Sequence, residues 1–292
     1  MRLAKKRPVL TLTGSKGNIR VREITSGKYE AYSATKFLEP HRRDFYSFFL
    51  VRQGFIKYSI DFKLYACHAG EVFFMTPPQI YLIDSAEDFG GISINCQPES
   101  LSKEVLNLPI IRDGVQQNLV RPDMASLNDL VWLAEKMLNL ANDPDPFSAP
   151  LLRSLFSCFL ICLNKSWLKE NYSAKSDSFK IGIIDQFRVL INDHWKEIFL
   201  VKDYARRLHV SPGHLNSLAK ENTGQKAIEL IQGKKLIEAK RLLLYSDLSA
   251  KEIAYETGFD DSAYFNRFFK KWNGNTPQQF RLEIREKYKD PV

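Results

Sequence analysis

Two short segments in the last third of the chain carry polar side chains that could read DNA. The second segment contains Asn266, Arg267 and Lys270. The planar fork of Arg matches guanine O6 and N7, Asn can form two hydrogen bonds to adenine, and Lys suits a phosphate group. The spacing places such residues on one helix face, which indicates readout of base edges in a major groove. The candidate DNA-contacting residues of both segments are Gly213, His214, Asn216, Ser217, Lys220, Ser262, Ala263, Tyr264, Asn266, Arg267 and Lys270.

The two segments belong to one pattern that occurs twice, from Val201 to Gly224 and from Ser249 to Gly274. Each copy has a small residue where two helices cross, a tight turn, and a second helix with a polar start. This order is typical of a helix-turn-helix, whose second helix enters the major groove. The residues that recur are Ala205 and Ala254, Val210 and Phe259, Leu215 and Phe265, Asn216 and Asn266, Leu218 and Phe268, Lys220 and Lys270, and Gly224 and Gly274.

Local signals mark where these helices begin. Ser211 is a suitable N-cap before Pro212, which favours the first helical position. Ser249 and Glu252 have the spacing of a capping box. We expect Gly258 to make the turn of the second copy.

One long helix is predicted between the copies, from Lys226 to Ser246. At about 1.5 Å per residue it spans roughly 30 Å, and successive major-groove faces lie about 34 Å apart. Such a helix can hold the two reading helices one turn apart on one duplex. Gly233 lies near its middle, which indicates either close packing or a tolerated weak point. Amphipathic helix pairs also occur in other α-helical domains, but two aligned copies with this spacing favour DNA binding.

Length and charge set the broad class of protein. The 292 residues are enough for two domains with full cores. The net charge is +8, and residues 178–292 hold 20 Lys and Arg against 15 Asp and Glu, which suits a polyanionic partner. No apolar run reaches membrane-spanning length, and the first residues lack the apolar stretch of a secretory signal. We therefore expect a cytoplasmic, nucleoid-associated protein without a membrane partner.

The first 110 or so residues read as strands. Short β-rich runs separated by Gly and Pro predict an antiparallel sandwich or barrel. The predicted strands cover residues 45–54, 55–70 (with a turn at Ala69-Gly70), 71–79 and 90–97.

Two helices are predicted next, over residues 123–143 and 150–172. The second is apolar almost all round, so we expect it to be buried on more than one side. Its second side is covered either by another copy of the chain, which gives a homodimer, or by the same subunit. Both alternatives stay open.

The residues offer little for catalysis. Cys67, Cys96, Cys158 and Cys162 lack the paired spacing of a zinc site or a disulfide framework. Cys158 and Cys162 are interpreted as core thiols, with a redox switch as the alternative. No Ser-His-Asp, Cys-His or phosphate-loop pattern is present. The chain is therefore predicted not to be an enzyme and to need no cofactor.

Residues 179–292 resemble the AraC/XylS family of bacterial transcription regulators, most specifically from Ile253 to Arg281. The resemblance implies a seven-helix domain with two reading helices and control of promoters through contact with RNA polymerase. Carried over by position, it implies base contacts at Gly213, Asn216, Ser217, Ser262, Ala263, Tyr264 and Arg267.

The strand region resembles the cupin-type sensor domain that many members carry, over residues 40–54 and 69–79. A metal-binding cupin needs two close His, a carboxylate and a later His. His41 stands alone and Arg43 replaces the second His, so we expect no metal and interpret His41 as a surface residue at a strand end. Sensor barrels bind small molecules among inward side chains. The candidate effector contacts are His41, Arg43, Tyr46, Phe48 and Tyr58.

The predicted fold is α+β with two domains. An N-terminal antiparallel β-barrel, cupin-like and with two following helices, occupies residues 1–172. A linker follows at 173–178, and an all-α domain with two helix-turn-helix units occupies 179–292. The leading function is a homodimeric DNA-binding regulator controlled by a small-molecule effector. One alternative is a regulator whose barrel only dimerises and binds nothing, and another is a cupin enzyme, which the missing metal ligands argue against.

Overall fold

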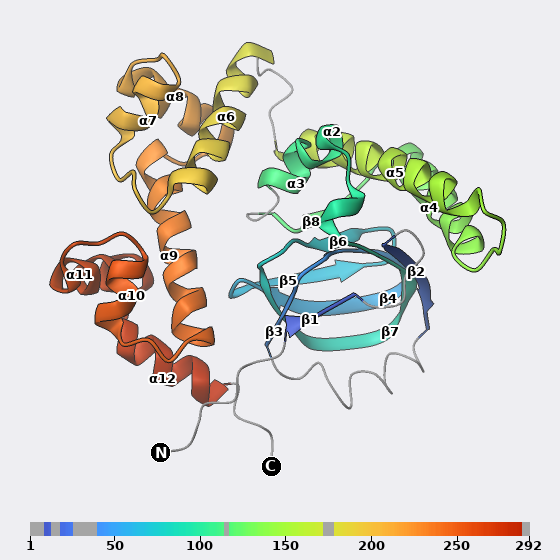
Figure 1. Ribbon diagram of the computed structural model, residues 1–292, viewed down its shortest axis with the longest axis horizontal. Helices are drawn as coiled ribbons and strands as arrows, with labels where there is room; N and C mark the ends of the chain where they lie inside the picture. The colour runs from blue at the N-terminus through green and yellow to red at the C-terminus, as the bar shows by residue number, and fades with distance from the viewer. Residues whose placement is uncertain (1–8, 13–17, 26–39, 114–116, 172–177, 288–292) are drawn as a thin grey trace. The chain divides into compact units, whose positions relative to one another are not determined.

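The computed structural model describes residues 9–12, 18–25, 40–113, 117–171 and 178–287. The chain divides into two compact units, one ending at Asn171 and the other containing the described residues from Ser178 onward (Figure 1). The predicted linker at 173–178 lies almost wholly outside the described residues. The domain bounds 1–172 and 179–292 therefore stay predictions.

The first unit is built on an eight-stranded sheet in the order β1-β3-β7-β4-β6-β8, with β2 on β7 and β5 on β4. All pairs are antiparallel except β1 with β3. Among the described strands the hydrogen-bonded order runs from β1 to β8, and these two strands do not pair with each other, so the predicted barrel is corrected to an open sheet. The strands are β1 (Val9–Leu10), β2 (Ile19–Ile24), β3 (His41–Arg43), β4 (Tyr46–Ile60), β5 (Lys63–His68), β6 (Val72–Met75), β7 (Ile80–Cys96) and β8 (Leu119–Val120).

Strand β4 continues through Gly54, where the sequence predicted a strand end. Gly54 has φ +65°, and a Cβ atom there would lie 2.2 Å from the Glu87 carbonyl oxygen. The pairing of β4 with β7 shifts register on both sides of Gln53, which is the signature of a β-bulge. The turn comes later, at Asp61 and Phe62, which both have positive φ. The stretch predicted as one run over 55–70 is thus a hairpin.

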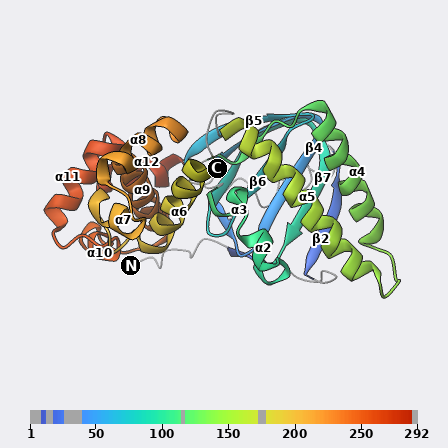
Figure 2. The same ribbon diagram turned by 90° about the horizontal axis from the view of Figure 1, so that it is seen from above.

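Two long helices cover one face of the sheet, α4 (Met124–Leu140) and α5 (Ser148–Asn171) (Figures 1 and 2). Phe48 on β4 packs against Phe156 and Phe159 on α5, with ring centres 5.8 and 6.4 Å apart. By length and composition α5 could cross a membrane, so the expectation that no apolar run has this length is wrong. Its buried face is part of the core of this unit, and a core helix passes the same test. The connecting elements are η1 (Pro98–Ser100), α2 (Lys103–Leu106) and α3 (Pro109–Asp113).

The cysteines are free thiols in two different settings. Cys67 and Cys96 are buried in the sheet, and burial raises the pKa of both thiols. Cys158 is exposed on α5 and Cys162 is half-buried, so the interpretation as core thiols is wrong for Cys158.

The second unit consists, in its described part, of seven helices, the number that the family resemblance implies. The long helix α9 contacts helices of both repeats (Figure 1). Phe187, Tyr204 and Leu215 share one core cluster with Leu230 at the start of α9. The helices are α6 (Ser178–His194), α7 (Val201–Arg207), α8 (Pro212–Thr223), α9 (Ala227–Tyr245), α10 (Ala250–Glu256), α11 (Ser262–Asn273) and α12 (Pro277–Lys287).

Candidate nucleic-acid interface and effector pocket

The first repeat turns between α7 and α8. Ala205 is fully buried, and its carbonyl oxygen accepts a hydrogen bond from Val210 N at 3.0 Å. Ser211 is the N-cap of α8 and accepts from His214 N at 3.1 Å, and Pro212 follows at the first helical position, as predicted. The small residue, the turn and the cap together fix the direction in which α8 leaves the core.

The second repeat reproduces this geometry. Phe259 N donates to the Ala254 carbonyl oxygen at 2.9 Å, and Ala254 is fully buried. The predicted capping box of Ser249 and Glu252 is present. Sequence reasoning missed the N-cap of α11, which is Asp261 accepting from two backbone amides. An acidic residue at that position also complements the positive end of the helix dipole.

Each second helix buries one face and exposes the other. The buried apolar residues are Leu215, Leu218, Ala219, Phe265, Phe268 and Phe269. The exposed candidates are Gly213, His214, Ser217, Lys220, Ala263, Tyr264, Asn266, Arg267 and Lys270, and the half-buried ones are Asn216 and Ser262. The structure therefore gathers the DNA-contacting candidates of each repeat on the outer face of α8 or of α11. Their contacts with bases stay predictions.

Hydrogen bonds distinguish the candidates. Asn216 Oδ1 accepts from Ala227 N at 3.2 Å, so part of its capacity is used at the start of α9. The Arg267 side chain is 71% exposed, and its guanidinium lies 3.9 Å from the Asp261 carboxylate. An exposed pair at this distance contributes little to stability. The exposed Arg267 guanidinium is thus accessible to solvent on the outer face of α11.

A buried lysine lies between the two repeats. Lys235 on α9 is fully buried, and its ammonium lies 3.4 Å from the centre of the Phe199 ring. Its Nζ donates to the carbonyl oxygens of Lys196 and Thr257 at 3.4 Å each. Burial lowers the pKa of Lys235 to about 7, and the nearby Glu197 opposes that shift. Through these hydrogen bonds Lys235 connects α9 with the segment before α7 and with the C-terminal end of α10.

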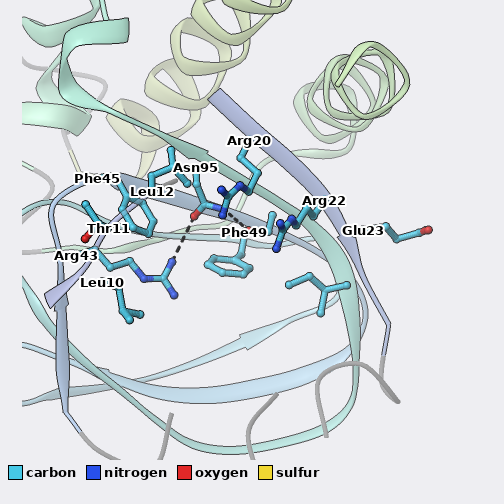
Figure 3. A pocket seen from close by; sticks show the side chains of 12 residues that line it. Leu10, Thr11, Leu12, Arg20, Arg22, Glu23, Arg43, Phe45, Phe49 and Asn95 are labelled. Atoms are coloured by element: carbon cyan, nitrogen blue, oxygen red, sulfur yellow. Dashed lines mark hydrogen bonds between the residues drawn. The ribbon is translucent and has the colours of Figure 1, made fainter. Parts of the chain in front are cut away.

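The first unit contains a pocket of about 280 Å³ on the sheet face opposite the helices (Figure 3). Arg20 and Arg22 reach into it from β2, and Arg43 reaches in from β3, with the Phe49 ring between them. Arg43 donates through Nη1 to Ser47 Oγ and, at 3.4 Å, to Asn95 Oδ1, and through Nε to the Tyr81 hydroxyl.

Of the five candidate effector contacts, only Arg43 lines this pocket. Tyr46 and Phe48 lie on the other face of β4, where Phe48 contacts α5. Tyr58 is buried in the cluster beside the pocket and packs on Phe73. His41 is 1% exposed and packs edge-on against Tyr81, so the interpretation as a surface residue is wrong.

Sequence reasoning missed Arg20, Arg22, Phe49 and Asn95. The signal was present in residues 19–24, where Ile19 and Val21 alternate with the two arginines. Such a period-2 pattern predicts a strand with one buried and one polar face. For metal binding, no group of three His, Cys, Asp or Glu side chains lies together among the described residues.

Comparison with known proteins supports both halves of this description. A model of an AraC-like ligand binding domain matches residues 26–156, and a helix-turn-helix domain model matches residues 204–283. The chain belongs to the AraC family. It is 24% identical to the HTH-type transcriptional activator RhaS of Citrobacter koseri, over 82% of this chain and 86% of that protein. It is also 24% identical to the arabinose operon regulatory protein of Escherichia coli (strain K12), over 77% and 76%.

Among solved structures, ToxT from Vibrio cholerae matches 91% of this chain and 98% of that chain, with 15% identity and a TM-score of 0.43. The two domain models and the curated relatives show that the AraC-family chain is a DNA-binding transcription regulator with an N-terminal domain of the ligand-binding type.

Proposed function

We propose that this AraC-family regulator is a homodimeric transcription activator whose α8 and α11 read two successive major-groove segments of one operator. The observation that carries the proposal is the repeated geometry of two capped reading helices, both packed on α9. In this proposal α11 is the stronger reader, because it exposes Arg267 and Lys270 while α8 has Gly213, which has no side chain, in its first turn. The effector enters the N-terminal unit and changes operator occupancy or promoter activation.

Footprinting tests the two-groove proposal directly. Bound DNA is first mapped genome-wide, and the full chain is then footprinted on an enriched site with hydroxyl radicals. We expect each monomer to protect two segments about one helical turn, or roughly 34 Å, apart. Protection of a single segment would contradict the proposal. DNA fragments that were not enriched in the mapping are footprinted in the same way, as the control for non-specific binding.

The homodimer rests on the outer face of α4 and α5. Trp132, Leu151 and Ile161 are 55%, 48% and 44% exposed there, and large exposed apolar patches mark interaction sites. We expect the full chain to sediment as a dimer at micromolar concentration and Ile161→Glu to shift it toward monomer. Lys165→Glu, at an exposed polar position of the same helix, is the matched control. A monomeric wild-type chain would contradict the dimer.

Activation requires contact with RNA polymerase, and the site of action is the cytoplasm on nucleoid DNA. The activator class follows the name of the RhaS relative. Transcription in vitro with purified polymerase distinguishes activation from repression, because an activator raises transcript yield from a promoter beside the mapped operator.

A further inference from the structure

We propose that the pocket of the first unit binds a small organic carboxylate, with the carboxylate held by Arg22 and Arg43 and an apolar body against Phe45 and Phe49. The inference rests on the proposed effector control and names the chemical class of that effector.

Strand register brings the polar side chains to one wall. On three adjacent strands, Arg20 pairs with Asn95 and Asn95 with Ser47, while Arg22 pairs with Ser93 and Ser93 with Phe49. Residues at paired positions of neighbouring strands point to the same face. The wall therefore carries two rows of side chains. Each row has one arginine, followed by neutral polar or aromatic residues.

Arg43 faces this wall, and none of its partners among the described residues is acidic. Its described hydrogen-bond partners are the Tyr81 hydroxyl, the Ser47 hydroxyl and the Asn95 amide oxygen, all neutral. Its guanidinium also lies 4.4 Å from the centre of the Tyr81 ring and 5.3 Å from that of Phe45. These contacts orient the cation, and no described residue compensates its charge, which favours an anion in the pocket.

The surrounding charges agree with this assignment. Glu23 also borders the pocket, but its carboxylate points away from the arginines (Figure 3). Arg22 is exposed and forms no ion pair with any described residue. Guanidinium groups donate charge-assisted hydrogen bonds to carboxylates, and in this proposal Arg22 and Arg43 bind the same anionic group.

The remaining lining sets the size and the body of the ligand. The volume of about 280 Å³ lies near the low end of small-molecule pockets, at about 300 Å³. Phe45, Phe49, Leu10 and Ile24 supply apolar surface beside the arginines. A small carboxylate with an apolar or aromatic body fits both features, whereas a neutral sugar leaves the charges unmatched.

The test uses the full chain and matched probe pairs at millimolar concentration: benzoate with benzamide, and hexanoate with hexanamide. Phenyl phosphate is added to separate carboxylates from phosphate esters. We expect at least one carboxylate to raise the thermal midpoint while its amide does not, because a ligand of the native state stabilises it. Titration calorimetry then gives the affinity for that probe.

Arg22→Gln should lower the affinity for the carboxylate roughly tenfold or more. This is the loss expected when one charge-assisted hydrogen bond is removed. Arg52→Gln is the matched control, because Arg52 pairs with Glu135, outside the pocket, and this change should leave the affinity unaltered. Arg22 is exposed, so its variant is expected to fold, and Arg43→Gln provides a second test in the same assay.

Three outcomes would overturn the assignment. These are equal binding of amide and carboxylate, tighter binding of phenyl phosphate, and no midpoint shift with any carboxylate. Footprinting is done on the same samples, so intact operator protection with no carboxylate binding would refute this inference while leaving the DNA-binding proposal in place.

Discussion

His209 and Gly258 occupy the same position of the two repeats, and both have left-handed backbone conformations, with φ +56° and +82°. Each precedes the residue whose amide donates to the buried alanine of its repeat. Since a histidine adopts this conformation in the first copy, conformation alone does not require glycine in the second. The additional requirement is the Lys196 carbonyl oxygen, which would lie 2.0 Å from a Cβ atom at position 258.

Gly258→Ala is therefore expected to lower the free energy of unfolding by at least about 2 kcal/mol, since conformational cost and a backbone clash act together. Gly274→Ala is the matched control. Gly274 also has positive φ, but a Cβ there meets nothing within 4 Å, so only the conformational cost of about 1–2 kcal/mol applies. Urea unfolding followed by circular dichroism measures both. Equal losses in the two variants would show that the Lys196 contact is unimportant.

Arg267→Ala should cost about 1–3 kcal/mol of specific DNA binding and relax the preference at one base pair. Lys270→Ala should weaken binding to all sequences alike and lower the salt slope by about one. Binding to an operator and to a scrambled duplex is measured over a range of salt concentrations. If Arg267→Ala keeps its discrimination between the two duplexes, the face assigned to α11 is incorrect.

Substitutions at Gly233 in α9 test whether this helix fixes the relative position of the two repeats. A Cβ atom at this position meets nothing within 4 Å, so of the two explanations for this glycine the structure favours the weak point over close packing. Gly233→Ala should raise the free energy of unfolding by up to about 1 kcal/mol. Operator affinity should not fall, because the helix remains straight.

Gly233→Pro should instead kink α9 at a cost of about 3 kcal/mol and misalign the reading helices. Circular dichroism should stay largely helical while specific affinity falls toward the non-specific level. Footprinting of both Gly233 variants completes the comparison, and wild-type affinity in the proline variant would refute the two-repeat proposal.

Lys235 predicts a pH dependence of stability. Its pKa is about 7 in the fold and about 10.4 in the unfolded chain. Between these values the unfolded state holds a proton that the folded state lacks, so this residue makes the free energy of unfolding rise with pH from about 7 to 10.4. Below pH 7 both states are protonated and its contribution no longer changes with pH.

The contribution of Lys235 is isolated by difference, because buried Tyr and Cys residues also titrate at alkaline pH. Lys235→Met keeps an unbranched chain against Phe199 but carries no charge. Urea unfolding of both proteins from pH 7 to 10 should show a smaller rise with pH in the variant. Parallel curves for the two proteins would mean that the Phe199 ring and the two carbonyl groups keep Lys235 charged throughout.

The helical repeats were predictable because their signals are local. Caps such as Ser211 and Ser249, and the spacing of buried residues such as Leu215 and Phe265, depend on neighbours a few positions away. The pocket was not predictable in the same way. Side chains alternate between the two faces of a strand, and a β-bulge reverses that alternation for the residues after it. Ser47 and Phe49 face the pocket side at odd positions, whereas Tyr58, beyond the bulge at Gly54, shares that side at an even position.

In the two-groove proposal, position 213 offers the regulator a route to new target genes. Gly213 lies near the start of a reading helix, is exposed, and has open space where a side chain would begin. A longer polar residue there can reach a base edge without displacing anything in the protein. Under the proposed function, a single codon change at position 213 would alter the bases that α8 reads, while the effector specificity, which we assign to the other unit, would be inherited unchanged.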